Sequence, residues 1–429
     1  MADLAPTHDA STLTPPIDAT RPRSGLRARI PDYPPAVWWM ATGNLILWTG
    51  RGMVVPFIVI FFSQIIGISA SLVGLGIAVA GVAGIVFVLA IAGLIDRRGG
   101  HPVLVACILI YSFAILGHTL ATNIWLFFLM TLVMNMSSQV YWPASDSTIA
   151  SLTDASRVTV AMSALRVANA VGIGLGGLIG GLIVSNGGLP EYRMLFITSA
   201  ALVLFAGVLV RLKVPNTPLQ ARNAEGNHGT WQDVRPDRLY LYACAVLMLM
   251  IIGFSQMQVT VPAFLRREAG IDEGMIGVLF LVNTLLVIVL QLPLAGWVSR
   301  HNVGRLLAIA GVMWAGAFAT MLLAANNGMP VAVAVFVLFT AGELIFMPAT
   351  AVIPVRLAPA HLRGRYFSLL SVGWGLSYAI ASLLGGVALD LPHTEIMWPI
   401  LAVCMLVGAV GALRLATPDR LAPPSSSST

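Results

Sequence analysis

The chain has 429 residues, of which 58% are apolar and only 10% are charged, whereas soluble proteins carry about 25% charged residues. A soluble protein of this length needs far more charge to cover its surface, so the composition excludes an ordinary cytosolic enzyme and a disordered protein. The net charge of +6 does not indicate a nucleic-acid binder, because the basic residues are scattered a few per segment. The remaining class is a polytopic membrane protein embedded in a lipid bilayer.

Twelve apolar runs are long enough to cross a bilayer as helices, for which about 20 residues are needed. The longest polar stretch between them divides the runs into six and six. The expected parts of the chain are a tail (1–35), a six-helix bundle (36–212), a linker (213–238), a second bundle (239–415) and a tail (416–429). The runs lie at 36–63, 70–95, 102–121, 124–147, 159–184, 194–212, 239–264, 275–298, 304–325, 329–353, 366–388 and 395–415.

The distribution of basic residues predicts the orientation in the membrane, because cytoplasmic segments carry the excess of Lys and Arg. With both termini in the cytoplasm, 19 of the 24 basic residues lie in cytoplasmic segments. The exceptions are Arg193, Arg266 and Arg267 on the outer side and Arg51 and Arg166 within spans. We therefore expect a protein of the cytoplasmic membrane with both ends inside the cell.

The two halves of the chain match each other locally at an offset of 203–206 residues. Pro56 in VVPF corresponds to Pro262 in TVPAF, and GISASLVG (67–74) corresponds to GIDEGMIG (270–277). The near-constant offset indicates two copies of a six-span unit, in which these prolines are expected to kink their helices. Repeated units with a binding site between them at the membrane midplane are typical of alternating-access transporters.

Two motifs relate the chain to a known family. AGLIDRRGGH (92–101), after the second span, resembles the signature G-x-x-x-D-R-x-G-R-R of the major facilitator superfamily, and Asp96, Arg97 and Gly99 match it. The fifth span contains GIGLGGLIGG (172–181), which is similar to the G-x-x-x-G-P-x-x-G-G motif of the drug antiporters in this superfamily. The glycines that match this second motif are Gly172, Gly176, Gly180 and Gly181, and Gly177 replaces its proline.

The resemblance implies an all-α membrane protein of twelve transmembrane helices in two pseudo-symmetric six-helix bundles, with spans 1, 4, 7 and 10 lining a central cavity. It also implies that Asp96 and its neighbours form a gating clasp on the cytoplasmic side. The N-terminal end of span 11 is the expected dock, because a helix N-terminus favours a carboxylate. Met136 in span 4 stands where the family carries an arginine that is tied to proton coupling.

Polar side chains interrupt the apolar pattern of these four spans and are candidate cavity residues. Charged groups at the bilayer centre are costly and are retained where they face a cavity or a partner. Asn44, Trp48 and Arg51 share one face of span 1, and Glu343 shares a face with Thr340 in span 10. The other candidates, in spans 4 and 7, are Asn135, Ser138, Gln139, Trp142, Asp146, Gln256 and Gln258. The last two lie about 200° apart on a helix, so at most one can face the cavity.

Several of these residues allow more than one interpretation. Glu343 is the natural proton carrier, because it is a carboxylate at cavity depth, but it could also neutralise Arg51 as a buried pair. Arg51 could instead clamp an anionic group of a substrate. Asp146 lies near the cytoplasmic end of its span and is either a ligand or a solvated carboxylate. His118, near the outer end of span 3, is expected in the interfacial region.

Motifs of other energy sources and of enzymes are absent from the sequence. There is no phosphate-binding loop, and Lys213 is the only lysine, which excludes ATP-driven transport by this chain alone. No Cys/His cluster has metal-binding spacing, and no nucleophile–base pair stands out. We therefore expect no metal, no cofactor and no enzymatic activity.

The sequence thus predicts a secondary active transporter that exports small, partly apolar compounds in exchange for protons by alternating access. Glu343 would take up a proton from the outer side and release it inside, and substrate would compete with that proton in the cavity. An alternative is a dedicated carrier for a sugar, an organic acid or a siderophore, in either direction. A third is a non-transporting receptor or scaffold, against which the short loops argue. We expect the protein to be a monomer.

Overall fold

The computed structural model describes residues 34–153, 158–216, 237–359 and 362–417. Within these residues all regular structure is helical and there is no strand. Twelve helical segments are long and apolar enough to cross a membrane. This confirms the all-helical, twelve-span fold expected from the apolar runs, whereas most of both expected tails and of the expected linker lies outside the described residues.

The first six spans form one group of helices. Span 1 is built from α1 (Pro35–Val54), α2 (Ile58–Ile60) and the π-helix η2 (Phe61–Ile65). Its interruption coincides with Pro56, which lies between α1 and α2. The single helices that follow are α3 (Ala70–Arg98), α4 (Gly100–His118), α5 (Ile124–Leu152), α6 (Val158–Ile183) and α7 (Leu189–Lys213).

The last six spans form a second group with the same kind of interruption. Span 7 is built from α9 (Arg238–Val259) and α10 (Val261–Glu268), and Pro262 lies in the first turn of α10. The remaining spans are α11 (Glu273–Ser299), α12 (Val303–Met321), α13 (Ala324–Leu357), α14 (Arg363–Asp390) and α15 (Met397–Leu413), the last flanked by the 3-10 turns η4 (Thr394–Ile396) and η5 (Arg414–Ala416).

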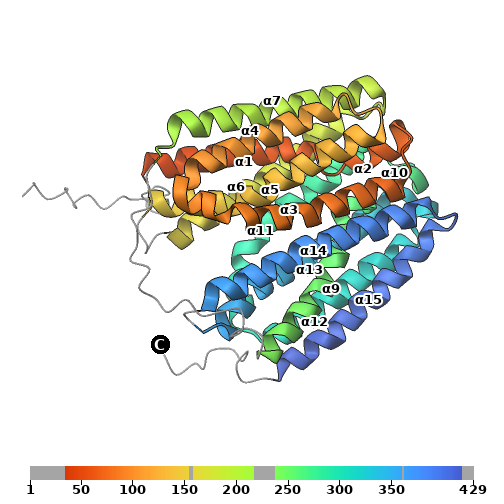
Figure 1. Ribbon diagram of the computed structural model, residues 1–429. Coiled ribbons are helices and arrows are strands. Elements are labelled where there is room, and N and C mark those ends of the chain that lie inside the picture. Colours follow the sequence, from red (N-terminus) through yellow and green to blue (C-terminus); the bar gives the residue numbers. More distant parts are fainter. Residues whose placement is uncertain (1–33, 154–157, 217–236, 360–361, 418–429) are drawn as a thin grey trace, which may run out of the picture.

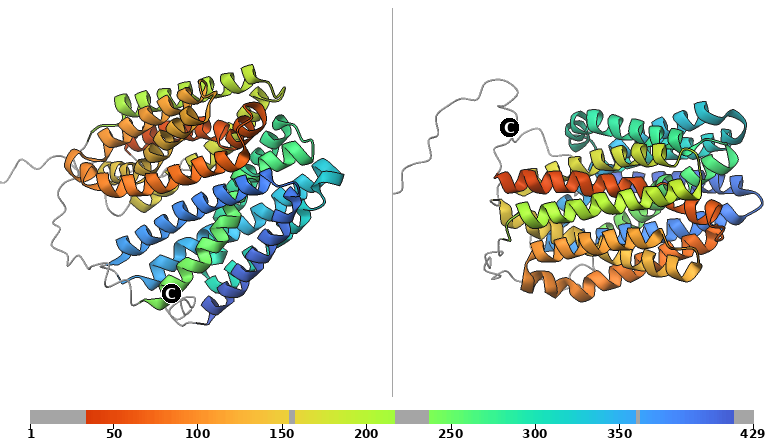
Figure 2. Two further views of the ribbon diagram at one scale, coloured as in Figure 1. Left: turned by 45° about the vertical axis from the view of Figure 1, so that its right-hand side comes forward. Right: turned by 90° about the horizontal axis from the view of Figure 1, so that it is seen from above.

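The two groups lie side by side as two bundles (Figure 1). They contact each other mainly along two helix pairs, α3 with α14 and α6 with α11, with a smaller contact of α2 with α10. In Figure 2 the bundles converge at the end that carries η2 and α10, and they diverge toward the end where α7 finishes and α9 begins. We call these the closed end and the linker end.

Glycines set the close approach of both helix pairs. A Cβ atom on Gly277 of α11 would lie 2.6 Å from the carbonyl oxygen of Gly177 and 3.2 Å from the Cα of Gly181, both in α6. A Cβ on Gly74 of α3 would lie 3.1 Å from the Cα of Gly386 in α14. Gly74 corresponds to Gly277, and Gly181 to Gly386, at the offset of the internal repeat. The two contacts are therefore equivalent crossings, at which small residues let the backbones touch.

The glycine run of α6 packs against both bundles. Gly172, Gly176 and Gly180 are four residues apart and face α1, where a Cβ on Gly172 would lie 2.8 Å from the carbonyl oxygen of Leu45. Gly181 lies on another face and meets α11. The helix is thus held between its own bundle and the second one, so the motif brings three helix backbones together.

His118, the last residue of span 3, is enclosed by side chains of the first bundle. It is fully buried at the end of α4, with its Nδ1 2.7 Å from the carbonyl oxygen of Ala114 and its Nε2 3.2 Å from Oγ1 of Thr131. Its ring stacks on Phe196 with the centroids 5.9 Å apart. Both ring nitrogens therefore have a partner within the protein, as buried polar groups usually do.

Candidate functional site

An arginine lies in an aromatic cage inside the first bundle. Arg51 of α1 is 9% exposed, and its guanidinium carbon lies 4.3 Å from the ring centroid of Trp48 and 4.5 Å from that of Tyr111 in α4. Its Nη2 donates a hydrogen bond of 2.6 Å to the hydroxyl of Ser138 in α5. Aromatic faces attract cations, so the rings stabilise the charge in the place of water.

No described carboxylate neutralises this arginine. Among the described residues, the ion pairs are made by other side chains, and Arg51 and Glu343 do not pair. The Arg51 Nε is buried without a hydrogen-bond partner in the protein. A guanidinium has five N–H donors, and an unpaired buried donor is costly. The cage therefore holds a cation that can still donate one hydrogen bond to an anionic or carbonyl oxygen.

A network of hydrogen bonds fixes the face of α1 that carries Arg51. The Tyr141 hydroxyl of α5 donates to Oδ1 of Asn44 in α1 and accepts a hydrogen bond of 3.3 Å from Nε1 of Trp48. Asn44 Nδ2 donates to Oδ1 of Asn169 in α6. Asn44 and Tyr141 are buried, and a satisfied buried network of this kind holds its helices in one arrangement.

A small pocket beside this network is lined by side chains of opposite charge. Asp146 of α5 and Arg166 of α6 both line it, together with Asn44 and Trp142. Asp146 and Arg166 do not form an ion pair within the described part of the chain. The indole of Trp142 is 37% exposed and packs on Trp48 with the centroids 5.4 Å apart. The structure thus brings the stripes predicted for spans 1 and 4 together.

Glu343 lies near the middle of α13 in the second bundle. Its Oε2 accepts a hydrogen bond of 3.0 Å from Nδ2 of Asn283 in α11, and the same amide donates to the hydroxyl of Thr340 at 2.8 Å. Thr340 in turn donates to the carbonyl oxygen of Phe336 at 2.6 Å. Among the described residues no cation lies at ion-pair distance from Glu343. Its carboxyl group is therefore oriented by a neutral amide.

The glutamines of α9 differ in burial. Gln256 is fully buried and donates a hydrogen bond of 3.1 Å to the carbonyl oxygen of Ala381 in α14. It also accepts one of 2.5 Å from the hydroxyl of Thr260. Gln258 is half-buried. Gln256 thus ties α9 to α14.

Asn135 and Gln139, which were also predicted to face the cavity from span 4, lie nearer the middle of α5 than Asp146 does. Asn135 donates a hydrogen bond of 3.0 Å to the carbonyl oxygen of Thr131 in its own helix. Gln139 reaches the contact of α3 with α14, since a Cβ on Gly84 would lie 2.8 Å from its Cγ and one on Gly375 would lie 3.4 Å from its Nε2. Gln139 therefore lies between the bundles.

The predicted gating motif lies at the linker end of α3. Arg97 is exposed in the last turn of the helix. Gly99 ends the helix with a φ of 83°, a left-handed backbone conformation that favours glycine. The side chain of Asp96 lies outside the described residues, as do those of the first two residues of α14.

Sequence reasoning missed three residues that complete these contacts, namely Tyr111, Asn169 and Asn283. All three lie on spans 3, 5 and 8, which the resemblance did not place at the cavity. The two asparagines were visible as single polar residues in apolar runs, such as LVNTLL (281–286). The sequence gives no sign of which distant helix each one meets.

Two bundles of six spans, joined by equivalent crossings and holding isolated charged groups in their interiors, define the class of multi-pass membrane transporters built from repeated units. The family model of the Major Facilitator Superfamily matches residues 40–264 and 244–429. The chain belongs to this superfamily, as the two sequence motifs suggested.

Curated relatives match over most of their length at low identity. The "Uncharacterized MFS-type transporter YqjV" of Bacillus subtilis (strain 168) is 23% identical over 367 residues, which cover 84% of this chain and 88% of the relative. The "Multidrug resistance protein MdtH" of Shigella boydii is 22% identical over 387 residues, covering 87% and 91%. A "Na(+), Li(+), K(+)/H(+) antiporter" of Planococcus maritimus is 22% identical over 389 residues, covering 83% and 90%.

Solved structures share the fold. The nucleoside transporter NupG superposes with a TM-score of 0.69 at 14% identity, over 90% of this chain and 100% of that one. A bacterial homolog of the human lysosomal transporter Spinster, in an inward-facing and unoccupied conformation, superposes with a TM-score of 0.66 at 14% identity, over 89% and 95%. At this identity the likeness shows the fold alone.

Proposed function

We propose that the protein exports small, partly apolar compounds in exchange for protons. The observation that carries this proposal is the position of Glu343, which lies near the middle of α13 and is bound by the amide of Asn283. A carboxyl group at this depth is costly unless it serves a pathway. Without a fixed cation beside it, such a group can take up and release a proton during the cycle.

The proposed cycle uses the two ends of the bundles. The linker end faces the cytoplasm, as the basic residues predict, so the bundles diverge on the inner side. Glu343 releases its proton there, and substrate enters between the bundles near the Arg51 cage. Rocking of the bundles then exposes Glu343 and the substrate to the outside, where a proton displaces the substrate. A multidrug resistance protein and a Na(+), Li(+), K(+)/H(+) antiporter among the relatives are consistent with drug substrates and with exchange for protons.

The test is a flux assay with purified protein in proteoliposomes under an imposed pH gradient. A panel of dyes, antibiotics and sugars serves as substrates. Glu343→Gln keeps the shape of the side chain but cannot ionise, and we expect it to abolish proton-driven efflux while leaving substrate exchange in the absence of a gradient. The matched control is Glu395→Gln, since Glu395 is an exposed carboxylate at the closed end. Undiminished proton-driven efflux by Glu343→Gln would show that the coupling residue lies elsewhere.

A second candidate function is a dedicated carrier for an anionic metabolite, such as an organic acid or a siderophore. The observation that favours it is the unpaired, buried Nε of Arg51, which fits one oxygen of a carboxylate or phosphate. Arg51→Lys keeps the charge but removes the planar fork of donors. If this function holds, binding should require an anionic group on the ligand and should be lost in Arg51→Lys. Equal transport of neutral compounds by the variant would favour drug export.

A further inference from the structure

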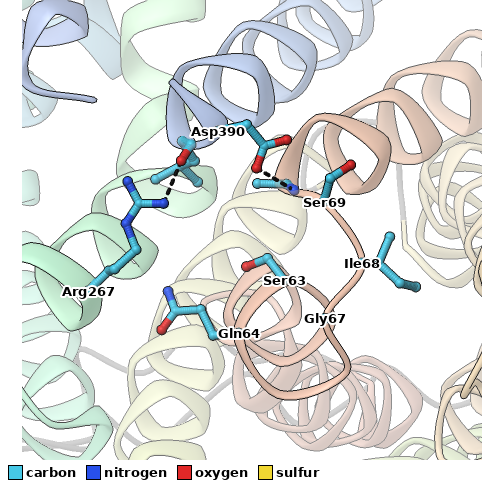
Figure 3. A pocket seen from close by; sticks show the side chains of 9 residues that line it. Ser63, Gln64, Gly67, Ile68, Ser69, Arg267 and Asp390 are labelled. Atoms are coloured by element: carbon cyan, nitrogen blue, oxygen red, sulfur yellow. Dashed lines mark hydrogen bonds between the residues drawn. The ribbon is translucent and has the colours of Figure 1, made fainter. Parts of the chain in front are cut away.

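Two carboxylates bridge the bundles at the closed end, and neither is among the candidate cavity or gating residues predicted from the sequence. The first is Asp390, the last residue of α14. Its Oδ1 accepts a hydrogen bond of 2.9 Å from the backbone N–H of Ala70 (Figure 3). Its Oδ2 accepts one of 2.7 Å from the backbone N–H of Ser71. Both donors lie in the first turn of α3. Asp390 of the second bundle therefore caps a helix of the first.

The chemistry of this contact favours a charged carboxylate. The first N–H groups of a helix have no partner within the helix, and the helix dipole adds partial positive charge at the same place. Arg267 of α10 supports the contact from the other side, because its guanidinium donates to the carbonyl oxygen of Leu389 and to the hydroxyl of Thr394. The end of α14 is thus held in place while its carboxylate reaches across.

A pocket of about 150 Å³ adjoins this contact. Ser63, Gln64 and Ser69 line it from the first bundle, and Arg267 and Asp390 line it from the second (Figure 3). The pocket is large enough for water. Water can therefore reach Asp390 and replace the helix N–H groups as its partner when the bundles separate.

The second carboxylate is Glu273, the first residue of α11, which is 1% exposed. Its Oε1 accepts a hydrogen bond of 3.0 Å from the Tyr192 hydroxyl of α7 and one of 2.8 Å from Nε of Arg266 in α10. Tyr192 belongs to the first bundle, whereas Glu273 and Arg266 belong to the second. A third bond across the same end joins Nε2 of Gln64 to the carbonyl oxygen of Ala263 at 3.1 Å.

The position of Asp390 in its helix has a counterpart at the linker end. Helices α3 and α14 run antiparallel, and each carries an aspartate at or near its C-terminus, Asp96 in α3 and Asp390 in α14. Each aspartate lies at the end where the partner helix begins. At the closed end this cap is formed, and at the linker end the bundles diverge (Figure 2). The same pair of helices can therefore be capped at one end or at the other.

We propose that Asp390, bound to the N-terminus of α3, and Glu273, bound to Tyr192, form the gate that keeps the closed end shut and must release for that end to open. In the orientation proposed above, this gate faces the outside of the cell. The inference rests on the alternating-access part of the proposed function. It does not depend on proton coupling or on the substrate.

The test measures the opening of the closed end directly, in the full-length protein in lipid nanodiscs. Nitroxide labels are placed at Thr122→Cys in the first bundle and His393→Cys in the second, both in exposed turns at the closed end. Cys107, Cys244 and Cys404 are replaced by serine. Pulsed electron paramagnetic resonance measures the distance between the two labels, and we expect a single short distance when Asp390 and Glu273 are intact. We expect Asp390→Ala and Glu273→Gln each to raise the population with the longer label-to-label distance at least fivefold.

The matched control is Asp272→Ala. Asp272 caps its own helix, since it accepts a hydrogen bond of 2.9 Å from the N–H of Met275, and this bond does not cross between the bundles. The control therefore removes a helix cap at the same end without touching the proposed gate. Distance distributions of Asp390→Ala and Glu273→Gln that match that of the control would overturn the proposal.

A second measurement covers the case in which these variants do not fold. Ser71→Cys and Leu391→Cys place two thiols on opposite sides of the Asp390 contact and leave Asp390 in place. Oxidation to a disulfide should lock the closed end, stop alternating access and abolish flux. Reduction of the disulfide should restore the flux. Flux that continues in fully crosslinked protein would refute the gate. Loss of coupling in Glu343→Gln tests only the proposed function, so the two failures can be told apart.

Discussion

The crossing of α6 and α11 allows the energetics of the closed end to be tested by adding one methyl group. A Cβ on Gly277 would lie 2.6 Å from the carbonyl oxygen of Gly177, and both partners are backbone. Restoring ordinary contact at 3.4 Å requires the two helices to separate by about 0.8 Å, because closely packed backbones cannot yield locally. When the closed end opens, the helices separate and the clash disappears.

The expected magnitude follows from the clash alone, because α11 is helical in both the closed and the open state and the gain in helix propensity cancels between them. Overpacking in a well-packed contact costs about 1–3 kcal/mol. Gly277→Ala should therefore destabilise the closed crossing by about 1–3 kcal/mol, which is a factor of roughly 5–150 in the equilibrium between closed and open. The open population should rise by this factor in the distance measurement.

Gly316 in α12 provides the control, because a Cβ there would have no atom within 4 Å. Gly316→Ala should leave the distance distribution unchanged and raise the thermal unfolding midpoint slightly, since it gains helix propensity without a clash. Gly74→Ala should behave like Gly277→Ala, because the two crossings are equivalent. If Gly277→Ala resembled Gly316→Ala in both measurements, the crossing would not be the tight contact described here.

Three further substitutions test the site and the gate. Ser138→Ala removes the hydroxyl that binds Arg51, a hydrogen bond to a charged group worth about 1.5–3 kcal/mol, and should weaken binding of an anionic probe at least tenfold by calorimetry. Tyr141→Phe breaks the buried network and leaves its acceptor unpaired, which should lower the free energy of unfolding by about 1–3 kcal/mol in denaturant titrations. Asp96→Ala should change the open population of the closed end in the direction opposite to Asp390→Ala, and the double variant should return toward the parent. An Asp96→Ala effect of the same sign would contradict the reciprocal caps.

The apolar runs predicted the number and order of the spans because burial in lipid leaves a strong compositional signal. They were less informative where charged residues lie inside helices. The run predicted at 194–212 is the helix Leu189–Lys213, since Glu191 and Arg193 form its first turns. The break at Pro56 was also predictable, because proline removes a helical hydrogen bond.

Contacts between distant helices could not be predicted in this way. The burial of His118 depends on rings from three other helical segments, and the bond between Glu343 and Asn283 depends on how α11 packs on α13. A single sequence reports which residues are polar at a given depth. It does not report which of them meet, because partner choice depends on the rotation of each helix in its bundle.

The cap made by Asp390 has a consequence for how this region can vary. Its partners are main-chain amides at positions 70 and 71, and almost any amino acid can supply such an amide. The partly exposed Ser71 should therefore tolerate most substitutions, with proline as the exception, because it lacks the N–H, whereas the buried Ala70 should accept only small side chains. Within this one contact, a particular side chain should be required only at the aspartate.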